Sequence, residues 1–198
     1  MLERSRVPTS ERSLPQQFTG PTCRAFVHTW CGWRDAARTV IPARSGIAPE
    51  SLGRLMADCL VMDFDGDAGD PVIRLAGSNV VERWGFEPTG MRFRDCLPGE
   101  HADWRVHVIR EAVQHPCGMR LVREVVRRHG LAYRAEICFL PVADDRRGVC
   151  QFFAVSDSDE RPFSVDTRAN PAAREGALDI TFIDIGAGVP SRRTAAVG

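Results

Sequence analysis

The sequence feature that most constrains the fold is a run of three β-prone segments separated by two tight turns. The segments cover residues 119–128, 131–142 and 149–156. A His-Gly pair separates the first two, and a polar five-residue segment at 144–148 separates the last two. Consecutive strands joined by such short turns pair antiparallel. Because polar and apolar residues alternate along them, we expect one covered sheet face and another that is at least partly wet.

A second hairpin and a helical region precede these strands. Residues 59–64 are apolar and β-prone, 65–70 form an Asp- and Gly-rich turn, and 71–76 return as a strand. A longer helical pattern at 99–115 is stopped by Pro116. Short helices are expected between the hairpin and this longer helix. The order predicts an α+β fold: a five-stranded antiparallel sheet with short flanking helices, one longer helix and an N-terminal helical extension.

The two ends of the chain differ in composition from its centre. Residues 1–22 are rich in Ser, Pro, Gln and charge, so we expect a disordered tail. Residues 23–156 form the predicted domain. Residues 157–198 are expected to be a mostly flexible tail, except that 178–185 alternate as a short strand does. That strand either docks on the sheet or stays unpaired and seeks a partner.

The first helix is predicted at residues 23–38, and it carries large apolar side chains at helical spacing. Amphipathic helices outside a domain core often pair with a second copy. We therefore expect a homodimer through three aromatic residues of this helix, Phe26, Trp30 and Trp33.

Charge and cysteine content exclude several classes of function. The net charge is zero, and all 26 basic residues are arginine, so neither a lysine Schiff base nor a phosphate-loop lysine exists. The arginine-rich strand at 120–128 lacks interleaved aromatic residues, so we expect no nucleic-acid partner. Seven cysteines without a CxxC pair predict neither a disulfide framework nor a metal site. With no signal peptide and no apolar run long enough to span a membrane, we expect a cytoplasmic protein.

Several short motifs occur in an order typical of a known family. They are Trp30-Cys31-Gly32-Trp33, Ile41–Ser45 with Ile47–Pro49, Arg74–Gly77, Trp84-Gly85, Thr89-Gly90 and Leu140–Val142. Over roughly residues 24–156, the chain resembles the PAS superfamily, in particular the short stand-alone PAS-like proteins of alphaproteobacteria.

The resemblance implies a small sensory domain that cups a ligand between a five-stranded antiparallel sheet and short helices. Such domains bind small molecules, or they dimerise and relay signals to a partner. We therefore expect a non-catalytic sensory or protein-interaction domain in bacterial signalling. The expected partners are a second copy of the chain or a signalling protein, together with a small-molecule ligand.

The resemblance also raises flavin and haem as cofactors. Cys96 lies near the position of the flavin-reactive cysteine of photosensory PAS domains, whose pattern is Gly-x-Asn-Cys-Arg-Phe, but Arg92 and Phe93 replace Asn and Cys. Haem-binding PAS domains often use a histidine of the long helix. His107 falls opposite the apolar side of that helix, while His101 and His115 lie near its ends. We expect neither flavin nor haem, and the cofactor stays unknown.

Large apolar residues of the helices and strands are the candidates for a ligand pocket between sheet and helices. These are Trp84, Phe93, Trp104, Val108, Phe139 and Phe153. The alternative is that these side chains only fill the core. We expect no catalytic residues. Two rival functions remain: a cone-shaped α+β pocket enzyme, for which Asp95 and Asp103 are the only nearby acids, and an interaction module without a ligand that pairs through 178–185.

Overall fold

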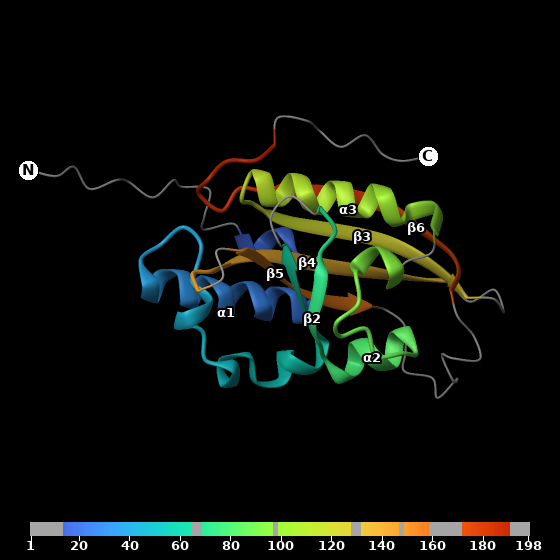
Figure 1. The fold of residues 1–198 in the computed structure, drawn as a ribbon, viewed down its shortest axis with the longest axis horizontal. Helices are drawn as coiled ribbons and strands as arrows, with labels where there is room; N and C mark the ends of the chain where they lie inside the picture. The colour runs from blue at the N-terminus through green and yellow to red at the C-terminus, as the bar shows by residue number, and fades with distance from the viewer. Residues whose placement is uncertain are drawn as a thin grey trace, which may run out of the picture.

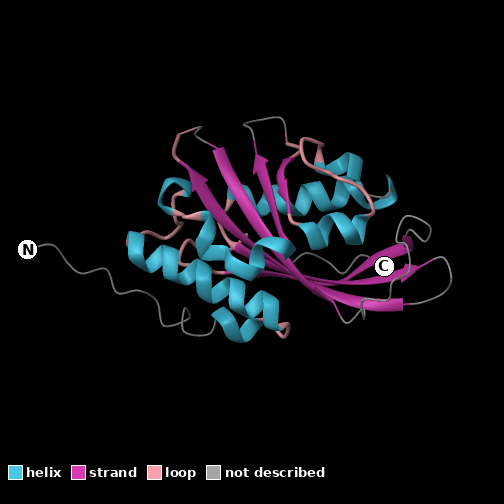
Figure 2. Ribbon diagram, turned by 90° about the horizontal axis from the view of Figure 1, so that it is seen from below, coloured by secondary structure: helices cyan, strands magenta, loops and turns pink. Residues whose placement is uncertain are grey.

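The computed structural model describes residues 14–64, 69–96, 99–127, 132–146, 149–158 and 172–190. These residues form three layers, with one antiparallel sheet between helices on both of its faces (Figures 1 and 2). The sheet has six strands in the order β2-β1-β5-β4-β3-β6. They are β1 (Cys59–Phe64), β2 (Val72–Ala76), β3 (Gly118–Arg127), β4 (Ala132–Asp144), β5 (Val149–Ser158) and β6 (Ala172–Ile183).

The α+β class and the antiparallel sheet are confirmed, but the expected number of strands, five, is too small. The sixth strand is β6, which pairs with β3 and begins at Ala172 rather than at residue 178. Of the two alternatives for residues 178–185, the docked strand is therefore correct. Its last part is held by burial, because Ile183 and Ile185 both lie in the core beside α1.

Helices precede and follow the first hairpin. The longest begins with a proline, Pro21, which suits the first turn because its missing N–H would have no partner there. The helices are α1 (Pro21–Ala37), η2 (Arg44–Gly46), η3 (Pro49–Asp58), α2 (Ser78–Trp84), η5 (Phe93–Cys96) and α3 (Gly99–Gln114). In the part of the chain that the structure describes, none of them is long and apolar enough to cross a membrane.

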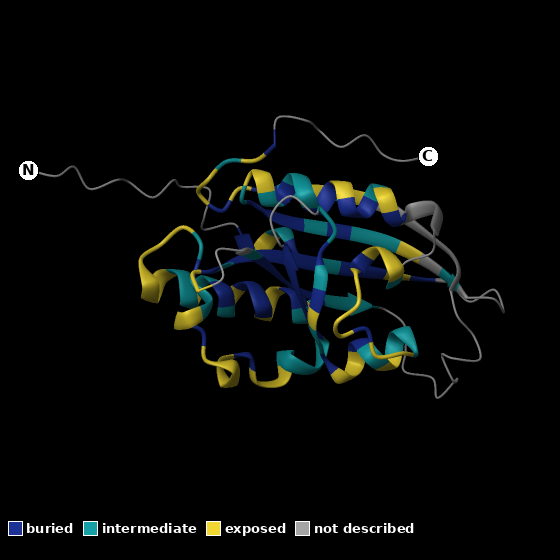
Figure 3. Ribbon diagram, in the orientation of Figure 1, coloured by how far each residue is buried: buried dark blue, intermediate teal, exposed yellow. Residues whose placement is uncertain are grey.

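Both faces of the sheet are covered, which corrects the expectation of a partly wet face. On β5, Phe153 and Val155 pack towards α1, whereas Phe152 and Ala154 pack towards α3. On β4, Leu140 joins the α1 side and Phe139 the α3 side. Figure 3 shows the resulting pattern, with buried strands in the centre and exposed residues on the outer sides of the helices. Strands that are buried on both faces are apolar without interruption, as residues 137–140 are.

The N-terminal segment is packed from residue 14 onwards, so the tail expected at residues 1–22 is wrong for its last part. Leu14 and Phe18 are fully buried against the α1 side of the sheet. Residues 1–13 lie outside the described residues.

The residues expected to form a dimer interface pack instead inside the chain's own core. Phe26 and Trp30 have no exposed surface, and the indole N–H of Trp30 donates to the carbonyl oxygen of Pro141 at 2.9 Å. Trp33 is half-buried and makes edge contacts with Phe26 and Phe153. The apolar side of α1 therefore faces the sheet, so Phe26 and Trp30 are not available to a dimer interface, and the dimer itself stays a prediction.

Candidate functional site

A cavity lies between the sheet and the helices α2, η5 and α3. The centre of a water-sized sphere can occupy about 70 Å³ of it. By the same measure one water needs roughly 10–15 Å³, so the cavity has room for several waters or for a small organic molecule. Its apolar lining comes from the facing sides of all these elements. The apolar residues are Leu60, Val80, Trp84, Phe93, Trp104, Val108, Ile109, Met119, Leu121, Ile137, Phe139, Ala154, Val155 and Ile180.

Five of the six residues predicted for a ligand pocket line this cavity: Trp84, Phe93, Trp104, Val108 and Phe139. The sixth, Phe153, lies on the other face of the sheet, where it contacts Trp33 of α1. The reason is that successive side chains along a strand point to opposite faces of the sheet. Phe153 is paired with Leu140, whereas Phe139 is paired with Ala154, so the two phenylalanines point to opposite faces.

The polar residues of the cavity gather at one end. Leu60, Ala154, Phe139 and Met119 form one row across β1, β5, β4 and β3. The next row on this face of the sheet contains Ser156 of β5, Ile137 of β4 and Leu121 of β3. Beyond it, Arg123 lies on the same face of β3. Asp58 directly precedes β1 at this end.

Two further arginines reach the same cavity from the helices. α3 ends at Gln114 and β3 begins at Gly118, so α3 runs back along β3 (Figure 1). Arg105, one turn before Ile109, therefore lies towards the Arg123 end of β3. From the last turn of α2, Arg83 donates to the Asp58 carboxylate at 3.1 Å.

Burial affects these cations differently. Arg105 is only 6% exposed, and burial lowers the pKa of its guanidinium to about 10, so it is protonated at neutral pH. Arg83 shares the Asp58 carboxylate with the side-chain amide of Asn79. Among the residues that the structure describes, Nη2 of Arg83 is buried without a hydrogen-bond partner. The cavity thus combines an apolar body with a cationic end.

Sequence reasoning missed Arg83, Arg105, Arg123 and Asp58. A signal existed for two of them: Arg123 alternates in step with Leu121, and Arg105 shares the helical face of Val108, Ile109 and Ala112. In a chain whose 26 basic residues are all arginine, no single arginine stands out.

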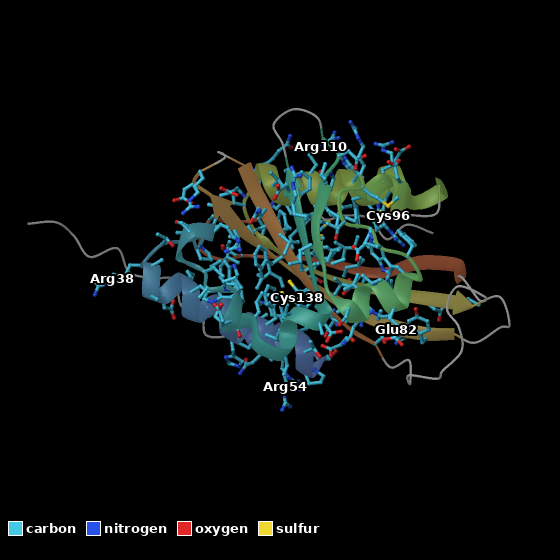
Figure 4. All side chains as sticks on the ribbon, turned by 60° about the horizontal axis from the view of Figure 1, so that its bottom comes forward. Arg38, Arg54, Glu82, Cys96, Arg110 and Cys138 are labelled. Atoms are coloured by element: carbon cyan, nitrogen blue, oxygen red, sulfur yellow. The ribbon has the colours of Figure 1, made fainter. Side chains whose placement is uncertain are left out.

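Of the residues considered for flavin or haem, Cys96, His107 and His115 do not line the cavity, and the side chain of His101 lies outside the described residues. Cys96 lies at the end of η5 (Figure 4), where its thiol donates to the Arg92 carbonyl oxygen. Burial, with Asp95 and Asp70 nearby, raises the pKa of this thiol to about 11, so it is protonated. His107 is 60% exposed and faces Glu111, as the sequence predicted. Among the described residues that line the cavity, none is a cysteine or a histidine.

A second cluster, Cys23, Glu136 and Asp157, has the residue types of a metal site. Both carboxylates are already engaged by backbone N–H groups at the start of α1. Glu136 accepts from Thr19 and Gly20, and Asp157 accepts from Thr22 and Cys23. Burial, with the neighbouring carboxylates, raises the pKa of the Cys23 thiol far above its ordinary value, so it is a poor ligand. The cluster therefore caps the helix and fastens it to β4 and β5.

The chain is similar to one family of sequences and to several solved structures. A family model described as a PAS domain matches residues 18–155. Among solved structures, the chain is similar to the LOV protein of Rhodobacter sphaeroides, with 15% identity and a TM-score of 0.40 over 56% of this chain and 64% of that one. It is also similar to a light-oxygen-voltage domain studied with a flavin analogue, with 15% identity and a TM-score of 0.42 over 57% and 84% of the two chains.

A third similar structure is an RNA-binding light-oxygen-voltage receptor, with 18% identity and a TM-score of 0.37 over 65% of this chain and 37% of that one. The match thus spans less than two thirds of the Rhodobacter protein and of the RNA-binding receptor. No curated protein sequence matches the chain. Because the family model covers well over half of its residues, the chain belongs to the PAS domain family.

Proposed function

We propose that this chain is a non-catalytic sensory domain that binds a small molecule in the cavity between α3 and the sheet. The observation that carries the proposal is the cavity itself. A concave site with a mostly apolar lining and a few convergent polar groups is the usual form of a small-molecule site. An unfilled cavity lowers the stability of a fold, so an occupant that binds only the folded chain stabilises it.

The strands offer a route from the cavity to the opposite face of the sheet. Phe139 lines the cavity and its neighbour Leu140 packs on the α1 side; in the same way, Ala154 lines the cavity and its neighbour Phe153 packs on the α1 side. A ligand that shifts β4 or β5 therefore changes the surface on which α1 rests. We infer that the ligand shifts the equilibrium between two positions of α1 on the sheet. A protein partner, or a second copy of the chain, recognises that change on the solvent-facing side of α1.

The positions of the acidic residues argue against the alternative of a pocket enzyme. Asp103 is 82% exposed and pairs with Arg94, and Asp95 is also exposed. The acid that lines the cavity is Asp58, which is held by Arg83 and Asn79. Asp58 is thus held in an ion pair and a hydrogen bond, which do not leave its carboxylate free as a general base. This geometry supports a binding role rather than catalysis.

An interaction module without a ligand is the second candidate. β6 pairs along β3 and is the last strand in the sheet order, so its other edge can accept a strand of a partner. Deletion of residues 170–198 is a poor test of this candidate, because it also removes the buried Ile183 and Ile185.

The expected cytoplasmic location stays a prediction.

A cavity-filling variant separates the two candidates. Ala154 is buried and lines the cavity, so Ala154→Phe fills it, while Ala36→Phe adds the same ring to an exposed position of α1. A set of small apolar and amphipathic molecules is screened by the rise in unfolding temperature. We expect binders whose effect is lost in Ala154→Phe and kept in Ala36→Phe. If no molecule raises the unfolding temperature, or if every effect survives in Ala154→Phe, the cavity is not a ligand site.

A further inference from the structure

Four aromatic side chains from four separate elements line the cavity. They are Trp84 of α2, Phe93 of η5, Trp104 of α3 and Phe139 of β4. Among the described residues, no ring pair joins any two of these four, and the ring contact of Trp84 is with Phe86, which does not line the cavity. Aromatic rings prefer edge-to-face or offset contacts with other rings. A ring placed in the cavity would make contacts that these four side chains do not make with one another.

The size of the cavity suits a single ring. The 70 Å³ that a water-sized sphere can reach corresponds to about five to seven waters at roughly 10–15 Å³ each. Since a water takes up about 30 Å³ of the liquid, the lower figure corresponds to roughly 150 Å³, which is the size of an apolar cavity that holds one benzene. A six-membered ring with a small substituent therefore fills the space.

The charged residues of the cavity are already engaged within the chain. Arg83 donates to the Asp58 carboxylate at 3.1 Å, and Arg105 and Arg123 also have interactions with other groups of the protein. A charged ligand would have to compete with these interactions, or it would lose its hydration without gaining a new partner. An isolated charge is costly to bury in a mostly apolar site. An uncharged molecule avoids both costs.

We propose that the cavity binds a small uncharged molecule with one aromatic ring, held among Trp84, Phe93, Trp104 and Phe139. This inference rests on the proposed function, since it names the class of ligand for the same cavity. Met119, which is buried and paired with Phe139 across the sheet, also lines the cavity. Its thioether is a favourable neighbour for an aromatic ring.

The test compares four probes that differ in charge or in aromaticity: benzyl alcohol, benzoate, benzylammonium and cyclohexylmethanol. Their dissociation constants are measured by NMR titration of the full chain. We expect benzyl alcohol to bind at least about tenfold more tightly than benzoate and benzylammonium, because only the charged probes lose ionic hydration. Cyclohexylmethanol should bind at least about threefold more weakly than benzyl alcohol, because it cannot make aromatic contacts.

A variant of the acid in the cavity tests the charge argument. Asp58→Asn keeps the shape of the side chain but removes the carboxylate that Arg83 and Asn79 bind. Benzoate should then bind about tenfold more tightly than it binds the unaltered chain, because Arg83 can pair with it, whereas the affinity for benzyl alcohol should hardly change. Asp35→Asn is the matched control, because Asp35 is exposed, pairs with Arg34 and does not line the cavity. Circular dichroism checks that each variant is folded. If Asp58→Asn does not fold, the four probes on the unaltered chain still decide the matter.

The results distinguish this inference from the function beneath it. If benzoate or cyclohexylmethanol binds as tightly as benzyl alcohol, the inference is wrong, but the cavity is still a ligand site when Ala154→Phe abolishes the binding. An affinity for benzoate that Asp58→Asn does not raise also contradicts the inference, because charge then does not govern the choice of ligand. If none of the four probes binds, the inference is overturned. The proposed function is overturned with it only if the screen finds no binder either.

Discussion

At the scale of single residues, the backbone packed around Gly77 leaves no room for a side chain at this position. Its N–H donates to the Cys59 carbonyl oxygen at 2.8 Å. A Cβ at this position would lie 2.2 Å from the carbonyl oxygen of Met56 and 2.3 Å from that of Ala57. These are backbone atoms, so a side chain there forces η3 and the start of α2 apart. The glycine of the Arg74–Gly77 motif is therefore a close-approach position.

Gly77→Ala should lower the free energy of unfolding by about 1–3 kcal/mol, the usual cost of overpacking. The measurement is urea unfolding followed by circular dichroism. Gly46→Ala is the control, since a Cβ at Gly46 meets no atom within 4 Å. Its effect should stay within about 0.5 kcal/mol. Equal stability of the two variants would contradict the proposed close approach.

Trp30 tests whether α1 is a core helix or a dimer helix. Trp30→Ala should cost about 3–5 kcal/mol of unfolding free energy, because it empties a fully buried site and removes the hydrogen bond to Pro141. His28→Ala, on the exposed side of α1, should have little effect. A native mass that halves in Trp30→Ala while the unfolding free energy is unchanged would restore the dimer interpretation.

At the scale of elements, the start of α1 is capped by carboxylates from two strands. Burial alone would raise the pKa of Glu136, but hydrogen bonds from Gly20, Arg120 and Thr19 and the charge of Arg120 lower it below its ordinary value. A carboxyl whose pKa is lower in the folded chain stabilises the fold above its ordinary pKa. That contribution is lost as the pH falls through the folded pKa.

Glu136→Gln should therefore destabilise the chain near neutral pH by about 1–3 kcal/mol, the cost of losing charge-assisted hydrogen bonds. Below the folded pKa, the difference between the variant and the unaltered chain should shrink, because Glu136 is then neutral in both states. Urea midpoints measured across the acid range check this. A difference that does not change with pH would show that the charge of Glu136 does not hold α1.

The sixth strand is the other element whose role can be measured. Ile183 is buried on the α1 side, so Ile183→Ala should cost about 2–5 kcal/mol. Thr181→Ala, two residues earlier and exposed, should change the unfolding free energy by less than about 0.5 kcal/mol. If both variants unfold at the same urea concentration, β6 adds nothing to the core.

At the scale of the whole molecule, the sequence predicted the hairpins because their turns are short and polar. It did not predict that both sheet faces are covered, although the unbroken apolar run at 137–140 was a signal. β6 was expected only in part because its first half contains Arg174 and Glu175. Phe153 was expected in the cavity but lies on the α1 side of the sheet. The alternation of residues along one strand shows which side chains share a face, but not which of the two faces packs against α3.

The cavity as a whole is the central claim, and methyl NMR during titration with a binder from the screen of small apolar and amphipathic molecules tests it most directly. Val108, Leu121 and Ile137 line the cavity, whereas Val27, Leu140 and Val142 pack on the other face of the sheet. The account predicts large, saturable shifts of the first three methyl groups and smaller shifts of the second three. Shifts confined to the second set, or no saturable shift in either set, would contradict it.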